Sequence, residues 1–171
     1  MLCYLSGEKW GKVVFPPVRK NAMSEFIGKY RYSVDDKGRV NIPVKLKKNL
    51  LESANGSFVI TRGFDGCLLL FPLDIWKHKV AEWKEKLNPY DAEDRSFLRT
   101  MTHWANDVQL DKQSRITIPG ELLGFAGISS EVILLGMLDN IEIWDPKRYE
   151  QYMGNIEPNY ESIASKVLGK K

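Results

Sequence analysis

The sequence predicts an α+β protein in which two copies of one β-rich unit form a single intertwined body. Three observations support this fold class. Two blocks of sequence recur in the same order, strand-like alternation is followed by helical spacing in each copy, and an extra helical segment separates the copies. One unit is too small to bury its own strands. We therefore expect the two copies to pair about a pseudo-twofold axis and to share a core.

The repeat is visible in two aligned blocks. Tyr32–Leu46 (YSVDDKGRVNIPVKL) matches Val108–Leu122 (VQLDKQSRITIPGEL), and Phe58–Trp76 matches Glu131–Tyr149. Within the first block, the matched polar and proline positions are Asp35 with Asp111, Arg39 with Arg115, and Pro43 with Pro119. Gene duplication explains this order and spacing better than coincidence.

The first block predicts two strands, a tight turn and a short helix. In the first copy the strands are Tyr30–Val34 and Arg39–Ile42, and Gly38 supplies the conformational freedom of the turn between them. Ser114 replaces this glycine in the second copy, so we expect that a positive φ is not required there. Pro43 and Pro119 end their strands and begin a short helix, which spans Val44–Leu51 in the first copy.

The second block predicts a strand pair followed by a helix in each copy. The expected elements are strands Ser57–Arg62 and Cys67–Phe71 with helix Leu73–Leu87, and strands Glu131–Leu135 and Ile141–Trp144, joined by a turn over Gly136–Asn140, with helix Pro146–Met153.

Between the copies, Asp91–Trp104 has the spacing of an amphipathic helix and completes a helical hairpin. The tail is expected to be a weak helix or disordered. The predicted organisation is an N-terminal extension over 1–25, a first repeat over 26–87, an inter-repeat helix over 88–106, a second repeat over 107–153 and a tail over 154–171. For residues 1–22 we favour an over-annotated start, with Met23 as the initiator, over an arm that becomes ordered on binding.

Composition and motifs argue against an enzyme. The formal net charge of +3 permits an anionic partner, and the two cysteines, Cys3 and Cys67, form no motif and fit a reducing cytosol. No apolar run approaches the roughly 20 residues of a membrane span. The two histidines, His78 and His103, are isolated, and the chain has no phosphate-binding glycine loop and no nucleophile elbow. We therefore expect no catalytic residue, no metal and no cofactor.

The Asp-x-x-x-Arg motif has two compatible interpretations. An aspartate that opens a tight turn can accept hydrogen bonds from backbone amides and pair with the following arginine. Alternatively, the arginines contact phosphates or base edges. Seven basic residues lie between Lys29 and Lys48, against only Asp35 and Asp36, which is typical of a phosphate-binding face, although a solvated charged face is the alternative.

Taken together, the segments DDKGRVNIP, DKQSRITIP, CLLLFPLDIW and EVILLGMLDNIEIWD give the chain a resemblance to the MraZ family of bacterial transcriptional regulators, over about Phe26 to Met153. The resemblance implies a swapped-hairpin, AbrB-like barrel and a ring-shaped homo-oligomer. It also implies binding of double-stranded DNA at direct repeats in the promoter of the protein's own division and cell-wall operon. The implied location is the cytoplasm, in association with the nucleoid, with neither a membrane nor a small-molecule substrate as partner.

The resemblance also implies which residues contact DNA. Arg39 and Arg115 match the family's signature arginines, and Arg31, Lys29 and Lys37 are candidates only through their positions. Asp35, Asp111, Gly38, Pro43 and Pro119 are expected to shape the turns. Because of its basic neighbours, the first copy is the better candidate, and Ser114 weakens the case for Arg115. The alternative function is a ring-forming or antitoxin-like protein-interaction module without specific DNA readout.

Overall fold

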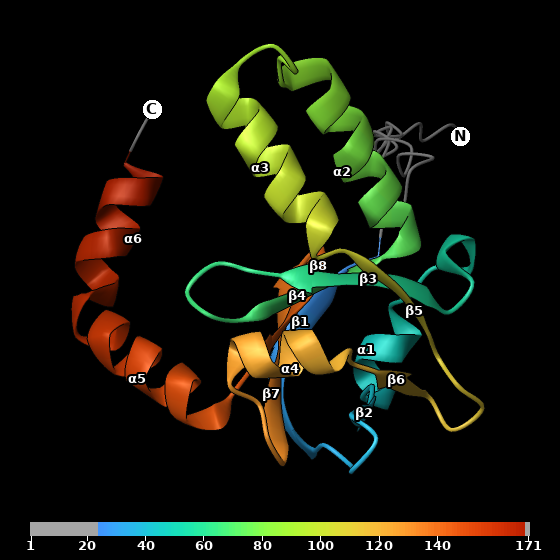
Figure 1. Cartoon of the computed structure of the whole chain (residues 1–171). Coiled ribbons are helices and arrows are strands. Elements are labelled where there is room, and N and C mark those ends of the chain that lie inside the picture. Colours follow the sequence, from blue (N-terminus) through green and yellow to red (C-terminus); the bar gives the residue numbers. More distant parts are fainter. Residues whose placement is uncertain (1–23, 170–171) are drawn as a thin grey trace, which may run out of the picture.

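The computed structural model describes residues 24–169, so the predictions for residues 1–22 lie outside the described part (Figure 1). The strands are β1 (Phe26–Ser33), β2 (Arg39–Asn41), β3 (Ser57–Arg62), β4 (Leu68–Pro72), β5 (Asn106–Gln109), β6 (Arg115–Thr117), β7 (Glu131–Leu138) and β8 (Asn140–Trp144). The α-helices are α1 (Val44–Lys48), α2 (Leu73–Lys86), α3 (Ala92–His103), α4 (Gly120–Ala126), α5 (Pro146–Ile156) and α6 (Tyr160–Leu168). Short 3-10 turns span Glu52–Ala54 and Glu157–Asn159.

Six strands form one antiparallel sheet in the order β1-β7-β8-β4-β3-β5, which confirms the α+β class. Strands from the two halves of the sequence alternate in this sheet, because β7 and β8 lie between β1 and β4. Figure 1 shows α2 and α3 side by side as a hairpin that projects from the sheet, while α5 and α6 form an arm on another side.

A separate two-stranded sheet, which we call the β2·β6 ribbon, joins the two copies. Its strands are antiparallel, and Val40 lies opposite Ile116 at the centre. The flanking hydrogen bonds are reciprocal. The Ile42 N–H donates to the Ser114 carbonyl and the Ile118 N–H to the Gly38 carbonyl, each at 2.9 Å. Each strand of the ribbon is therefore bonded to the turn of the other copy.

Buried side chains of both copies make up the main core. Val40 and Ile116 are fully buried, and so are Phe26, Leu70 and Leu134 from the larger sheet. A second cluster contains Ile75 of α2 and Tyr149 of α5, and it also includes Cys67, Leu69, Phe71, Ile133 and Trp144. Each core contains side chains from both halves of the chain, so neither half buries its apolar side chains alone.

The expectation that Ser114 needs no positive φ is wrong. Ser114 has a φ of 60°, in the same left-handed region as Gly38 at 71°. The cause is the turn itself, because the N–H of this residue donates to the carbonyl of the aspartate three positions earlier, at 2.9 Å for Ser114 and 3.0 Å for Gly38. The hydrogen-bonded turn therefore imposes the conformation on whichever residue occupies the position.

Several predicted boundaries also change. The first strand begins at Phe26 and not at Tyr30. The predicted turn over Gly136–Asn140 is wrong, because β7 continues to Leu138, where it pairs with Phe26 of the long strand β1. The first short helix ends at Lys48 and not at Leu51. In the tail, α5 extends to Ile156 and α6 follows, so the helical alternative holds and the disordered one does not.

Candidate nucleic-acid interface

The first turn is organised by Asp35. Its Oδ1 accepts hydrogen bonds from the backbone N–H of Lys37 at 3.0 Å and of Arg39 at 2.9 Å, and its Oδ2 accepts one from Arg39 Nε at 2.7 Å. These donors, above all the backbone N–H of Arg39, hold the pKa of Asp35 below its usual range. An ionised carboxylate therefore both shapes the turn and orients the arginine.

The second turn repeats this geometry around Asp111. Its Oδ1 accepts from the backbone N–H of Gln113 at 2.8 Å and of Arg115 at 2.9 Å, and Arg115 Nε donates to Oδ2 at 2.8 Å. The same backbone N–H of Arg115 is the main cause of the lowered pKa of Asp111. The pairing of aspartate and arginine is therefore kept where Ser114 replaces Gly38, and Arg115 Nη2 also lies 2.7 Å from Asp111 Oδ2.

The ribbon brings both arginines to one surface. Side chains alternate along a strand, and Val40 and Ile116 point into the core, so Arg39, Arg115 and their partners across the ribbon share the opposite face. The register places the two arginines diagonally, a separation of roughly 7–8 Å between Cα atoms. Both side chains are partly exposed, to 30% for Arg39 and 22% for Arg115.

Two further residues complete this face and were missed by the sequence analysis. Asn41 lies opposite Arg115, and Thr117 lies opposite Arg39. Both are exposed. The alternation of RVN and RIT would have identified them, since residues two apart on a strand point the same way.

The lysines of the first copy lie near both turns. Lys37 is exposed within the first turn. Lys47 extends from α1 to the second turn, where its Nζ donates to Ser114 Oγ at 2.8 Å. The positive charge of the first copy is thus next to the arginine motif of the second copy. The sequence analysis assigned the basic surface to the first copy alone, but Lys47 brings positive charge to the second turn as well.

The structure does not bring Lys29 and Arg31 to the ribbon. Both belong to β1 of the larger sheet, where Arg31 Nη2 is 3.1 Å from Glu131 Oε2. Lys29 Nζ lies 5.3 Å from the ring centroid of Tyr149 on α5. Their positive charges are therefore directed at β7 and α5.

Residues 24–169 contain no cluster of three or more histidine, cysteine or acidic side chains suited to a metal ion. None of the helices within this part of the chain has the length and apolar character of a membrane span.

A family model described as "MraZ protein, putative antitoxin-like" matches the chain twice, over residues 26–100 and 101–170. Curated relatives with the name "Transcriptional regulator MraZ" include one from Clostridium beijerinckii, 40% identical over 144 residues that cover 83% of this chain and 96% of the relative. One from Acetivibrio thermocellus is 38% identical over 142 residues, with 83% and 96% covered. One from Natranaerobius thermophilus is 35% identical over 144 residues, with 84% and 96% covered.

Proposed function

Because the chain belongs to the MraZ family, we propose that it is a transcriptional regulator that contacts DNA with the outer face of the β2·β6 ribbon. The prediction that the chain is not an enzyme is confirmed by this membership, since the relatives are named as transcriptional regulators. The same names support double-stranded DNA as the partner.

The observation that carries the proposal is the composition of the ribbon face. The major groove of B-DNA admits a two-stranded β-ribbon. Arginine suits a bidentate contact with guanine, asparagine suits adenine, and threonine contacts either a polar edge or the thymine methyl group. Arg39, Asn41, Arg115 and Thr117 supply these chemistries side by side.

The aspartates contribute by orienting the arginines. Arg39 uses Nε to bind Asp35, and no other acidic side chain of the described part lies within 4.0 Å of its guanidinium. The terminal amino groups of Arg39 therefore remain available for a base or a phosphate. A guanidinium that is already oriented loses less entropy when it binds.

We further propose that copies of this chain form a ring that binds direct repeats in the promoter of its own operon, on the nucleoid. Two exposed apolar surfaces support self-association. One is the exposed apolar face of α6, and the other lies where Ile27, Met137 and Leu138 meet at the edge of the β1–β7 pair. A contact between two different surfaces of identical chains is heterologous, and such contacts close into rings when the rotation permits.

The test is a gel-shift titration with the promoter of the protein's own operon. We expect Arg39→Ala and Arg115→Ala each to weaken specific binding by roughly 5- to 150-fold, the equivalent of losing one base contact. Arg31→Ala is the matched control, since it removes an exposed arginine outside the ribbon. If Arg31→Ala weakens binding as much as Arg39→Ala, the ribbon is not the reading surface.

A second candidate function is favoured by the words "antitoxin-like" in the family description, namely a protein-interaction module without specific DNA readout. The substitution Arg39→Lys separates the two functions. Lysine keeps the charge but loses the bidentate geometry. Specific DNA binding should therefore fall, whereas a protein-interaction module would be little affected.

A further inference from the structure

We propose that a surface pocket at the C-terminal end of α3 binds a phosphate group. We call it the anion pocket, and its volume is about 550 Å³. It combines two arginines and a histidine with an aromatic side chain, and none of the described residues that line it is acidic. The lining residues are Arg62, Arg99, Thr100, Thr102, His103 and Trp104.

Arg62, at the end of β3, is held in place by two aromatic rings. Its guanidinium carbon lies 4.3 Å from the ring centroid of Phe125 and 5.8 Å from that of Trp104. Stacking fixes the plane of the guanidinium while its N–H groups stay free at the edge. Within residues 24–169, no carboxylate lies within 4.0 Å of it. The matching position of the second copy is Leu135, so the repeat does not require an arginine here.

Arg99 and His103 extend the positive charge along α3. They are four residues apart, which places them on the same face of the helix, and both are exposed. The partial negative charge of a helix C-terminus, about half an elementary charge, disfavours an anion there. The two guanidinium groups of Arg62 and Arg99 together exceed that partial charge.

The chemistry of the pocket favours a phosphate over a stacked base. Three groups contact the ring of Trp104. The centroid of the His103 ring lies 5.2 Å from that of Trp104, edge-on, and the centroid of Phe125 lies 6.2 Å from it. The guanidinium of Arg62 lies over the Trp104 ring. Trp104 is therefore already engaged. The hydroxyls of Thr100 and Thr102 donate to carbonyls of their own helix. Guanidinium and imidazole N–H groups remain, and these are preferred partners of phosphate oxygens.

The anion pocket is separate from the β2·β6 ribbon. From Trp104 the chain runs along β5 to the turn that precedes β6, so the pocket and the ribbon lie at opposite ends of β5 (Figure 1). The phosphate can belong to a free nucleotide or to the backbone of bound DNA. Both sources present the same group, and they are distinguished below.

The two histidines of the chain provide a direct test. His103 lines the pocket, whereas His78 lies on α2 with its Nε2 3.3 Å from Glu82. The full chain is titrated with inorganic pyrophosphate at constant ionic strength, and the imidazole Hε1 resonances are followed by NMR. We expect a saturable shift of the His103 resonance and none of His78. If both resonances move in parallel without saturation, or if neither moves, the proposal is wrong.

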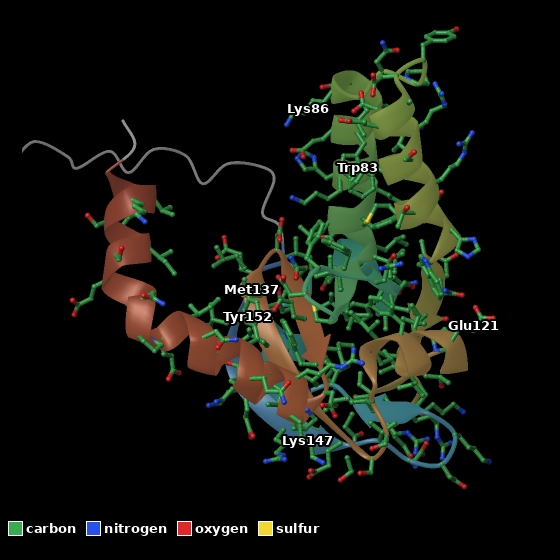
Figure 2. The ribbon with its side chains drawn as sticks, turned by 60° about the vertical axis from the view of Figure 1, so that its left-hand side comes forward. Trp83, Lys86, Glu121, Met137, Lys147 and Tyr152 are labelled. Carbon is green, nitrogen blue, oxygen red and sulfur yellow. The ribbon has the colours of Figure 1, made fainter. Side chains whose placement is uncertain are left out.

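Variants test whether the pocket arginines make the site. Arg99→Gln changes an exposed side chain, so it leaves the fold intact, and Arg62→Lys keeps the charge while losing the planar fork. We expect each to weaken pyrophosphate binding at least fivefold. Lys86→Gln, at the exposed end of α2 in Figure 2, is the matched charge-loss control and should bind as the wild type does. Equal binding by Arg99→Gln and wild type would overturn the proposal.

A second experiment, in which the same variants are titrated with promoter DNA, identifies the source of the phosphate. If the pocket holds a DNA phosphate, Arg99→Gln lowers the slope of log affinity against log salt by about one. If it holds a free phosphate ester, DNA binding stays unchanged while pyrophosphate binding is lost. The pyrophosphate arm needs no DNA. Its outcome therefore tests phosphate binding by the anion pocket even if the chain does not bind the promoter. Failure to bind the promoter would contradict the proposed function and not the pocket.

Discussion

At the scale of single residues, one carboxylate in each turn does more than the motif alone indicates. Asp35 and Asp111 each accept three hydrogen bonds, two of them from backbone amides. Their side chains remain about one-third exposed, at 33% and 37%. The turn and the orientation of the arginine therefore depend on the same ionised group, and both should respond to pH.

The first prediction concerns acid. Because the folded state lowers the pKa of Asp35 and Asp111 below the ordinary value of 3.8, their contribution to stability is complete above that value. It is lost as the pH falls through the lower, folded-state pKa. We expect the double variant Asp35→Asn, Asp111→Asn to lose less of its unfolding free energy between pH 7 and pH 3 than the wild type. Urea denaturation at both pH values measures this.

Asp36→Asn is the control for the acid prediction. The side chain of Asp36 is exposed and has no hydrogen bond to the described residues, so this variant should lose as much stability in acid as the wild type. A double variant that is as acid-sensitive as the wild type would show that the carboxylates do not stabilise the turns.

The second prediction concerns Gly38. Its φ of 71° is costly for a residue with a side chain, by roughly 1–2 kcal/mol, and an added Cβ would lie 2.9 Å from the Ile118 carbonyl oxygen. Gly38→Ala should therefore destabilise the protein by about 2 kcal/mol in urea denaturation. Gly124→Ala is the control, because an added Cβ at this helical glycine meets open space. This variant should have an unfolding free energy about 0.5–1 kcal/mol higher than the wild type. Equal stability of the two variants would contradict the assignment of strain.

Individual turn residues were predictable because their chemistry is local. The contact between aspartate and arginine depends on four residues of spacing, and the sequence analysis anticipated it. The φ of Ser114 was missed because serine normally avoids this region, and only the hydrogen bond to Asp111 reveals the need for it. The position of Lys47 beside Ser114 was not predictable either, since it depends on how the two copies pair.

At the scale of elements, the α2–α3 hairpin is attached to the sheet by a series of aromatic contacts. Phe71 of β4 contacts Trp76 at 5.8 Å, Trp76 contacts Trp83 at 5.5 Å, and Trp83 contacts Phe97 of α3 at 5.6 Å between ring centroids. Figure 2 shows Trp83 between the two helices. Trp83 therefore links Trp76 of its own helix to Phe97 of α3 and holds the hairpin together.

The third prediction follows from this series. Trp83→Ala removes two edge-to-face contacts and a half-buried ring, and we expect a loss of about 2–3 kcal/mol of unfolding free energy. Hydrogen exchange of the α3 amides should accelerate. Tyr90→Ala at the tip of the hairpin is the aromatic control, since Tyr90 is 90% exposed and its loss should cost no more than about 0.5 kcal/mol.

Element types were more predictable than element ends. The spacing of Phe97 and Met101 was enough to identify α3, because apolar periodicity is a local signal. The length of β7 was not predictable in this way. Its last residue, Leu138, pairs with Phe26 of β1 and has no partner in β8, and this pairing joins residues more than 100 positions apart in the sequence. Tertiary contacts thus override the glycine and asparagine that suggested an early turn.

At the scale of the whole molecule, the two halves are interleaved, and the described residues present two exposed apolar surfaces. One is the apolar face of α6, formed by Tyr160, Ile163, Val167 and Leu168, with exposed fractions from 41% to 82%. The other is the edge formed by Ile27, Met137 and Leu138. Contiguous apolar surface of this kind is typical of interaction sites. A second copy of the chain is the partner that the proposed ring requires.

The fourth prediction is that α6 holds the ring together. The double variant Ile163→Glu, Val167→Glu places two charges in the apolar face, so we expect light scattering after gel filtration to show a smaller assembly. Ser162→Glu is the control, because it adds charge to the polar side of the same helix. If the double variant assembles like the wild type, α6 is not the interface.

Loss of the ring should also change DNA binding in a way that separates assembly from readout. One chain with two arginines on its ribbon binds a single repeat weakly, while several chains on one ring gain from a high effective concentration at neighbouring repeats. The Ile163→Glu, Val167→Glu variant should therefore bind a single-repeat duplex as the wild type does, but lose the extra affinity for a duplex with several repeats. Arg39→Ala should weaken both. A variant that fails on the single repeat as well would mean that α6 supports the ribbon itself and not the contact between copies.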